Sequence, residues 1–143
     1  MTSLSIVFPV FRGWTHLHDL LDAIRLEDDN GIEVIVVDNA CKDGGVIEVR
    51  TRHPLTRMVV RKVNGGFAAA VNSGVAVASE RVVVIANSDL LTDLATVRVL
   101  ANSAAASPMT VFAPRVLTRA GDEQIIGHRW PTPWNSARDL FHA

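Results

Sequence analysis

The stretch Val82-Val83-Val84-Ile85-Ala86-Asn87-Ser88-Asp89 decides how this sequence is organised. It consists of five apolar residues, three of them consecutive valines, followed at once by a polar triplet. Short apolar runs rich in β-branched residues are typical of strands buried on both faces inside a parallel sheet. Because open α/β sheets bind ligands beyond the carboxyl ends of their strands, the triplet falls where a ligand would bind.

A second copy of the same pattern lies upstream, in Glu33-Val34-Ile35-Val36-Val37-Asp38-Asn39. It is again an apolar strand that ends in an aspartate. Two acidic strand ends in one small sheet predict a polar site at the carboxyl edge of that sheet.

Strand and helix patterns alternate along the chain up to residue 113. We predict strands at 4–10, 32–37, 57–63, 81–86 and 110–113, and helices at 13–24, 46–52, 67–78 and 93–106. Pro9 cannot donate to a ladder, so it is expected to mark the end of the first strand. The alternation predicts a doubly wound, mainly parallel α/β sheet. Right-handed crossovers would bring the ends after Val10, Val37 and Ala86 to one rim.

The tail differs from the rest of the chain. Residues 116–118 and 124–126 flank the turn Arg119-Ala120-Gly121-Asp122 and predict a β-hairpin. Residues 127–134 are predicted to be extended, because each proline disfavours helix at the residue before it. We therefore treat residues 1–143 as one domain, with the hairpin and extended segment of 114–134 at its edge.

Composition narrows the class of protein. Apolar residues make up 48% and charged residues 20%, as in soluble globular domains. A net charge of −1 with scattered arginines gives no nucleic-acid platform. Cys41 is the single cysteine, so no internal disulfide can form, and no apolar run reaches the length of a membrane span. We expect a cytoplasmic protein that could act at the inner face of the membrane through further parts.

Two common nucleotide motifs are missing. The turn after the first strand, Pro9-Val10-Phe11-Arg12-Gly13, lacks the Rossmann glycine fingerprint, and there is no Walker A motif. His16 and His18 lie two positions apart, so they are expected to be surface histidines rather than a zinc pair. Asp43 is expected on a loop surface and Cys41 to be a spectator thiol.

Strand-end carboxylates and small-residue loops remain as candidate site residues. Asp38 could accept a hydrogen bond from the imide N–H of a pyrimidine, or it could cap the next helix. Asp89 could hold a divalent cation that bridges a diphosphate, or it could cap the helix that begins near Thr92. Asn64-Gly65-Gly66 could let the backbone approach a ligand closely, or it could be only a turn.

These residues also carry a family resemblance. The ordered set closely resembles family 2 glycosyltransferases, and within them the bacterial rhamnosyltransferase-type branch, from about residue 4 to residue 134. Each motif is weak alone, whereas the set in this order and spacing is specific. It comprises Ser5-Ile6-Val7-Phe8-Pro9-Val10, Val36-Val37-Asp38-Asn39-Ala40, Asn64-Gly65-Gly66-Phe67, Asn72-Ser73-Gly74, Asn87-Ser88-Asp89 and Ala113-Pro114-Arg115-Val116-Leu117.

The resemblance implies a GT-A fold and a site for a nucleotide-diphosphate sugar. It places Asp38 on the pyrimidine base and Asp89 on a divalent metal, Mg²⁺ or Mn²⁺. The remaining nucleotide-binding residues that it implies are Pro9, Val10, Phe11, Asn64, Gly66, Asn72, Asn87 and Ser88. Two departures concern the sugar donor rather than the fold, since Arg12 stands where asparagine is common and Ser88 where proline is common.

The resemblance also implies what this chain does not contain. Family members are typically about twice as long, with a half after the hairpin that binds the glycan acceptor and carries the general base. We therefore expect the donor-binding part of an inverting glycosyltransferase, with dTDP-rhamnose as the favoured donor, and an isolated chain inactive in transfer. Of the aromatic and basic residues near the end, Trp130 and Trp134 are expected to cover a hydrophobic edge rather than stack on a sugar. His128 and Arg129 could meet the diphosphate or the acceptor.

Two other functions stay open from the sequence. One is a non-catalytic nucleotide-binding or assembly module of the same fold. The other is a nucleotidyltransferase, which also uses strand-end aspartates with magnesium, although such enzymes usually carry a glycine-rich basic loop after the first strand that this sequence lacks.

Overall fold

A computed structural model describes residues 2–26, 31–90, 92–118 and 120–124 of this chain. The chain divides into two compact units, Met1–Phe112 and Ala113–Ala143. The first unit holds an α/β sheet with its helices, and the second holds a short hairpin.

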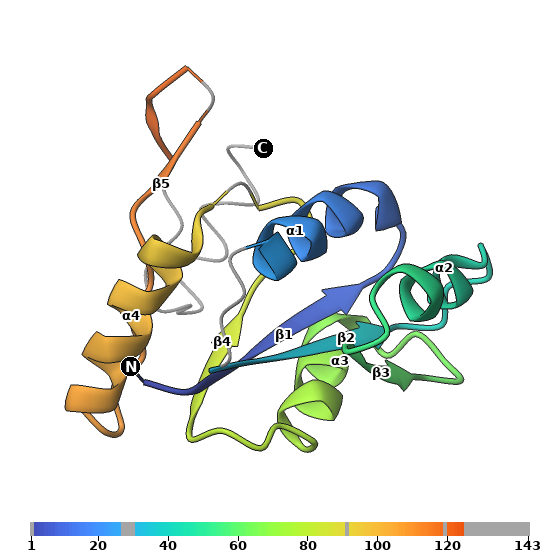
Figure 1. Cartoon of the computed structure of the whole chain (residues 1–143), viewed down its shortest axis with the longest axis horizontal. Helices are drawn as coiled ribbons and strands as arrows, with labels where there is room; N and C mark the ends of the chain where they lie inside the picture. The colour runs from blue at the N-terminus through green and yellow to red at the C-terminus, as the bar shows by residue number, and fades with distance from the viewer. Residues whose placement is uncertain (1, 27–30, 91, 119, 125–143) are drawn as a thin grey trace, which may run out of the picture. The chain divides into compact units, whose positions relative to one another are not determined.

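The sheet of the first unit has four strands in the order β3-β2-β1-β4 (Figure 1). All neighbouring pairs are parallel, as the alternation of strand and helix predicted. The strands are β1 (Leu4–Val10), β2 (Ile32–Asp38), β3 (Arg57–Val60) and β4 (Val82–Ile85). The central strand β1 is buried along most of its length, which agrees with its near-continuous apolar sequence.

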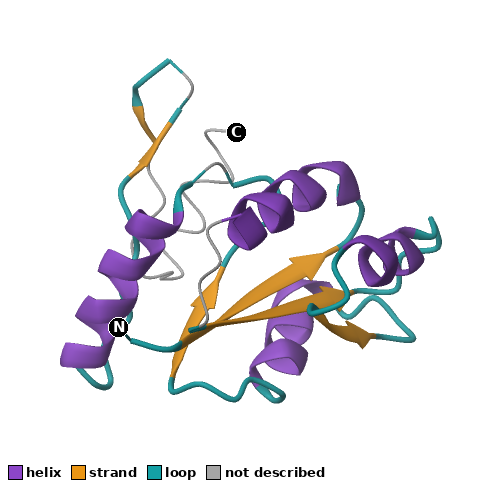
Figure 2. Cartoon of the chain, viewed as in Figure 1, coloured by secondary structure: helices purple, strands orange, loops and turns teal. Residues whose placement is uncertain are grey.

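Helices cover both faces of this sheet (Figure 2). They are α1 (Trp14–Leu26), α2 (Gly45–Arg52), α3 (Gly66–Val75) and α4 (Leu94–Ala106). Leu4, Ile6 and Phe8 pack in one core cluster with residues of α1, α2 and α4. Val7 points to the opposite face and packs in a second cluster with Ala70 of α3. None of the helices among the described residues is long and apolar enough to cross a membrane.

Pro9 lies inside β1 rather than at its end, because the strand continues to Val10. The backbone N–H of Ala86 donates to the carbonyl of Val7 (3.1 Å), so alternate residues of β1 turn their polar groups toward β4. The missing N–H of Pro9 therefore faces β4, whose pairing with β1 ends at Ile85. The proline therefore removes no hydrogen bond from the pairing of β1 with β2.

Two strand predictions need correction. The third strand was predicted to reach residue 63, but it ends at Val60. Residues 110–113 were predicted to form a fifth strand and have no regular secondary structure. Val111 is 95% exposed, so the apolar pattern there does not correspond to burial in this chain.

The second unit contains the predicted hairpin in shortened form. Val116–Leu117 (β5) pairs antiparallel with Glu123–Gln124 (β6). Thr118 donates its backbone N–H to the carbonyl of Asp122 (2.7 Å), and Arg115 forms an ion pair with Glu123 (3.3 Å). The predictions for residues 125–134 lie outside the described residues.

Candidate functional site

The ends of β1, β2 and β4 meet at one rim of the sheet. Beyond β2, the backbone N–H of Asn39 donates to the carbonyl of Val10 (2.8 Å). Beyond β4, the N–H of Ala86 reaches β1 in the same way. The loops that follow these strands therefore start side by side.

A cavity of about 190 Å³ opens at this rim. A cavity of roughly 150 Å³ can hold one benzene-sized ring, so this one has room for a single aromatic ring. Five of its lining residues are among those predicted for the nucleotide, and two, Asn39 and Phe67, were not predicted. The lining residues are Pro9, Val10, Phe11, Asn39, Asn64, Gly66 and Phe67.

Asn39 joins the loops that form the cavity. Its side-chain N–H₂ donates to the Oδ1 of Asn64 (2.8 Å) and to the carbonyl of Gly66 (3.2 Å). Its Oδ1 accepts from the guanidinium of Arg61 (2.5 Å) and the N–H of Gly65 (3.4 Å). The sequence showed Asn39 next to Asp38, but no pattern indicated that its amide would be 4% exposed and fully engaged.

Asp38 is not among the residues that line this cavity. Its side chain is 2% exposed, and its Oδ1 accepts the backbone N–H of Cys41 (2.8 Å). Asp38 therefore closes a turn within its own loop and does not cap α2, which begins after Gly44.

Cys41 connects the loops after β1 and β2. Its Sγ accepts the N–H of Arg12 (3.3 Å) and lies 3.6 Å from the carbonyl of Val10. Burial raises the pKa of this thiol to about 11, with the charges of Asp38 and Asp43 adding to the rise and the Arg12 N–H opposing it. The neutral thiol therefore acts as a structural bridge, and no reactive thiolate is present at neutral pH.

The polar triplet after β4 forms a turn closed by the N–H of Leu90 and the carbonyl of Asn87 (3.4 Å). A Cβ built on Gly13 would lie 3.8 Å from the Oγ of Ser88, so this turn lies beside the loop after β1. Asp89 is exposed, and the cap of α4 is Asp93, whose Oδ1 accepts the N–H of Thr96 (2.7 Å). Asp89 is thus not the helix cap.

The remaining predicted residue, Asn72, lies further along α3 and does not line the cavity. It is exposed on the helix that begins at Gly66. The structure therefore brings Pro9, Val10, Phe11, Asn64 and Gly66 together in one cavity. Asn72 and the triplet after β4 lie outside its lining.

Two residues of the rim loops have left-handed backbone conformations. Arg12 has φ 71° and Ala40 has φ 65°. Asparagine adopts this region with less strain than other non-glycine residues. Asparagine would therefore suit the backbone conformation at the position of Arg12. The guanidinium of Arg12 lies 5.4 Å from the ring centroid of Phe11. Such strain concentrates at ligand-binding loops.

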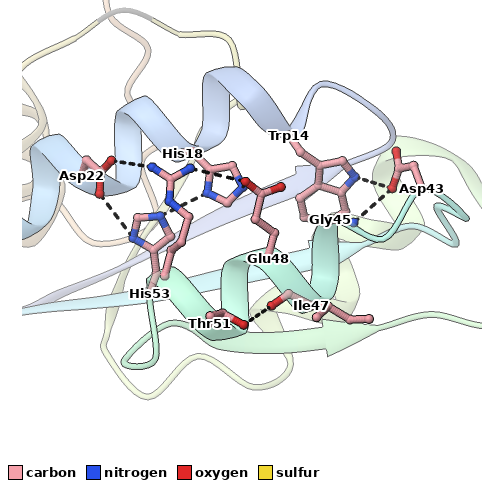
Figure 3. Close-up of polar contacts among 10 residues, drawn as sticks. Trp14, His18, Asp22, Asp43, Gly45, Ile47, Glu48, Thr51 and His53 are labelled. Carbon is pink, nitrogen blue, oxygen red and sulfur yellow. Dashed lines mark hydrogen bonds and ion pairs between the residues drawn. The ribbon is translucent and has the colours of Figure 1, made fainter.

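The two helices behind the rim make polar contacts of their own (Figure 3). The indole N–H of Trp14 donates to the Oδ1 of Asp43 (2.7 Å), so this exposed loop aspartate also holds α1. The prediction that His18 is a surface histidine is wrong, because its side chain is buried. His18 follows Trp14 by four residues, which puts both side chains on the packed face of the helix. His16 is exposed, as predicted.

Two further predictions concern a bound metal and the residues near the C-terminus. Within the described ranges no three His, Cys, Asp or Glu side chains gather into a metal cluster. His128, Arg129, Trp130 and Trp134 lie outside those ranges.

The chain is similar to known proteins in sequence and in fold. Residues 5–142 match the sequence signature of Glycosyl transferase family 2. A stretch of 73 residues, half of this chain, is 32% identical to an uncharacterized glycosyltransferase of Rickettsia bellii (strain RML369-C), and it covers 11% of that protein.

Two solved structures share the fold. The mannosyltransferase PcManGT from Pyrobaculum calidifontis, in complex with GDP-Man and Mn²⁺, aligns with a TM-score of 0.59 and 24% identity over 73% of this chain. TarS from S. aureus, residues 1–349, aligns with a TM-score of 0.63 and 20% identity over 73% of this chain. This chain covers about a third of each, 32% and 33%.

Proposed function

The chain belongs to Glycosyl transferase family 2, and from this premise we propose that it forms the donor-binding part of an inverting glycosyltransferase. Its ligand would be a nucleotide-diphosphate sugar, and the acceptor a glycan bound through further parts of the protein. The observation that carries the proposal is the ring-sized cavity at the carboxyl rim, lined by Pro9, Val10, Phe11, Asn64 and Gly66.

The base bound in this site is proposed to be a pyrimidine. Asp38 would accept a hydrogen bond from the imide N–H of the ring. A carboxylate offers about four acceptor positions, and the N–H of Cys41 occupies one of those on Oδ1. Likeness to the rhamnosyltransferase-type branch makes dTDP-rhamnose the favoured donor, and Asn72 is assigned to the side of the nucleotide by the same likeness.

The diphosphate is proposed to bind beside the loop after β4 with a divalent metal, Mg²⁺ or Mn²⁺. The donor set fits, because magnesium commonly takes only one or two carboxylates together with substrate phosphate oxygens. Asp89 is exposed at the rim and would provide the carboxylate, with Asn87 and Ser88 as neighbouring polar groups. A metal bound there would stabilise the charge on the departing diphosphate.

Transfer needs a further group. A general base must lie within about 3 Å of the attacking hydroxyl, and the rim carboxylates Asp38 and Asp89 are assigned to the base and the metal. We therefore expect this chain to bind the donor, to hydrolyse it slowly at most, and not to glycosylate an acceptor.

Calorimetric titration with UDP, dTDP and GDP in the presence of Mn²⁺ tests donor binding. UDP or dTDP should bind more tightly than GDP, and Asp89→Asn should weaken binding about tenfold or more. Asp19→Asn, an exposed aspartate of α1 that faces no part of the cavity lining, is the matched control and should bind as the parent does. No heat with any of the three nucleotides would contradict the proposal.

The variant Asp38→Asn tests how the base is recognised. Its side-chain oxygen can still accept the N–H of Cys41, so the loop should stay folded. Its amide no longer matches the imide reliably, and loss of such a pairing in a built site discriminates strongly. Affinity for UDP and dTDP should fall by about tenfold or more. Unchanged affinity would remove Asp38 from base recognition.

Incubation with labelled donor and candidate acceptors separates the two remaining functions. Donor binding without transfer fits the donor-binding part of an enzyme, and equally the non-catalytic module that the sequence left open. Transfer by this chain once it is joined to an acceptor-binding segment would favour the enzyme. A glycosylated product formed by this chain alone and lost in Asp89→Ala would show that the rim residues make a complete enzyme.

A further inference from the structure

Two buried histidines face each other where α1 packs against α2 (Figure 3). His18 lies on α1 and His53 directly follows α2, and they are 3% and 5% exposed. The Nδ1 of His18 and the Nε2 of His53 are 3.1 Å apart and share a hydrogen bond. Their rings stack with centroids 5.3 Å apart.

Each histidine turns its other ring nitrogen toward a carboxylate. The Nε2 of His18 lies 3.5 Å from the Oε1 of Glu48, and the Nδ1 of His53 lies 3.8 Å from the Oδ1 of Asp22. Arg52 bridges the two carboxylates from outside, at 3.0 Å from Asp22 and 3.4 Å from Glu48. The positive charge of Arg25 on α1 also acts on His53.

The number of protons on the four ring nitrogens determines which contacts between the rings and the carboxylates can form. Two neutral rings carry two protons, and one of them occupies the shared hydrogen bond. In either tautomer, one outer nitrogen then presents a lone pair to a carboxylate. The Nε2 of His18 fits this description, because it is buried and has no hydrogen-bond partner among the described residues.

A third proton satisfies every contact. One proton then lies between the rings, and each outer nitrogen carries an N–H directed toward Glu48 or Asp22. A fourth proton would set two N–H groups against each other across 3.1 Å and place two positive rings in contact. The hydrogen bond between the rings cannot survive that state.

We propose that His18 and His53 form a pH-operated latch between α1 and α2, closed while the rings share one proton and opened when both are fully protonated. Burial lowers the pKa of His53, with the charges of His18, Arg52 and Arg25 adding to the effect and Asp22 opposing it. The latch concerns proton binding and helix packing, so it does not depend on the nucleotide proposal.

The latch lies at the end of α2 away from the rim, and a second contact holds the other end. There Asp43 accepts from Trp14, and Gly45 packs against the indole, where an added Cβ would lie only 2.2 Å from the ring. Opening the latch should therefore free the last turn of α2 first, while the turn that follows Asp43 stays attached.

Nitrogen-15 NMR of the imidazoles between pH 8 and pH 4 tests the latch directly. We expect the pair to bind its protons in coupled steps, with a shared-proton state between them. In the step at lower pH, the NMR signals of the backbone amides in the last turn of α2 should change position. The exposed His16, which lies outside this pair, is the internal control and should show no shared-proton state. Absence of a shared-proton state between His18 and His53 at every pH in this range would overturn the proposal.

Urea unfolding at pH 7.5, 6.5 and 5.0 provides a second test. At pH 5.0, where the fourth proton opens the latch, the midpoint of the parent should be lower than at pH 6.5. His53→Asn, which keeps a donor and an acceptor but cannot be protonated, should show a smaller fall. His16→Asn should follow the parent. Equal pH dependence in the parent and in His53→Asn would contradict the latch, and if His53→Asn does not fold, the NMR titration of the parent decides.

Discussion

At the scale of single residues, Asn39 holds the rim together, because its amide side chain joins the loop after β2 to the loop between β3 and α3. It donates to Asn64 and Gly66 and accepts from Arg61. A buried amide of this kind cannot be replaced by an apolar side chain without leaving its partners unsatisfied.

We expect Asn39→Ala to lower the free energy of unfolding by about 1–3 kcal/mol, the typical cost of leaving buried polar groups without partners. Donor affinity should fall as well, since Asn39 lines the cavity. Chemical denaturation measures the first effect and calorimetry the second. Asn102→Ala, at an exposed site on α4, is the control and should change neither. An unaltered denaturation midpoint in Asn39→Ala would mean that the rim loops hold together without this amide.

At the scale of elements, the close approach of α3 to the sheet depends on Gly74. A Cβ built there would lie 2.4 Å from the Cγ1 of Val7 and 2.9 Å from the Cγ2 of Val37. The missing side chain at Gly74 therefore allows α3 to pack closely on the sheet.

Gly74→Ala should destabilise the protein by about 1–3 kcal/mol through overpacking. The sign is informative, because the same change at an exposed helical site would stabilise by about 1 kcal/mol. A double-mutant cycle with Val7→Ala measures the contact, and the penalty of the added methyl group should shrink in the Val7→Ala background. A stabilising Gly74→Ala would show that the helix can move away from the sheet at little cost.

Glu33 connects three elements at the opposite edge of the sheet. It accepts from Ser5 of β1, from the N–H of Ser79 before β4 (2.8 Å) and from Arg57 of β3 (3.2 Å). Desolvation favours a higher pKa for this carboxyl, but the hydrogen bonds from Ser5, Ser79 and Arg57 together outweigh it and lower the pKa from 4.5 to about 2.

Because the pKa of Glu33 is lower in the folded state than in the unfolded state, its contribution to stability is complete above about pH 4.5. It is lost as the pH falls from there toward 2. We expect Glu33→Gln to lose about 1–3 kcal/mol at pH 7 and to show a flatter acid-unfolding profile than the parent. Glu80→Gln is the control for a change of charge in the same region. A Glu33→Gln profile parallel to that of the parent would contradict this role.

At the scale of the whole molecule, the first compact unit contains both core clusters and all four strands of the parallel sheet. We therefore expect residues 1–112 to fold without the hairpin unit. Their thermal midpoint should lie within a few degrees of the parent's, since a difference below 1 kcal/mol moves the midpoint of a domain of this size by less than about 4–8 °C. Circular dichroism during heating measures this. Loss of cooperative unfolding would show that the hairpin unit completes the fold.

The parallel sheet and the order of its four strands and four helices could be predicted from the sequence alone. Continuous apolar runs such as 35–37 can be buried only between two layers of helices, and right-handed crossovers then leave few topologies. The run 82–85 was predicted to be buried on both faces, but it forms the edge strand β4, where Ile85 is 50% exposed. Five of the residues that line the rim cavity, Pro9, Val10, Phe11, Asn64 and Gly66, were implied by the family resemblance. The absence of a strand at residues 110–113 could not be predicted, because strand formation depends on a neighbouring strand that local sequence does not specify.

The tertiary structure was needed to show which polar side chains join the loops of the rim and which join the helices α1 and α2. Asn39 and Asn64 are separated by 25 positions, and His18 and His53 by 35. Contacts at such separations leave no local periodicity, so His18 was predicted at the surface although it is buried beside His53. The hydrophobic pattern fixes which face of an element is buried, whereas the partner of a buried polar group depends on how the packed elements place their side chains.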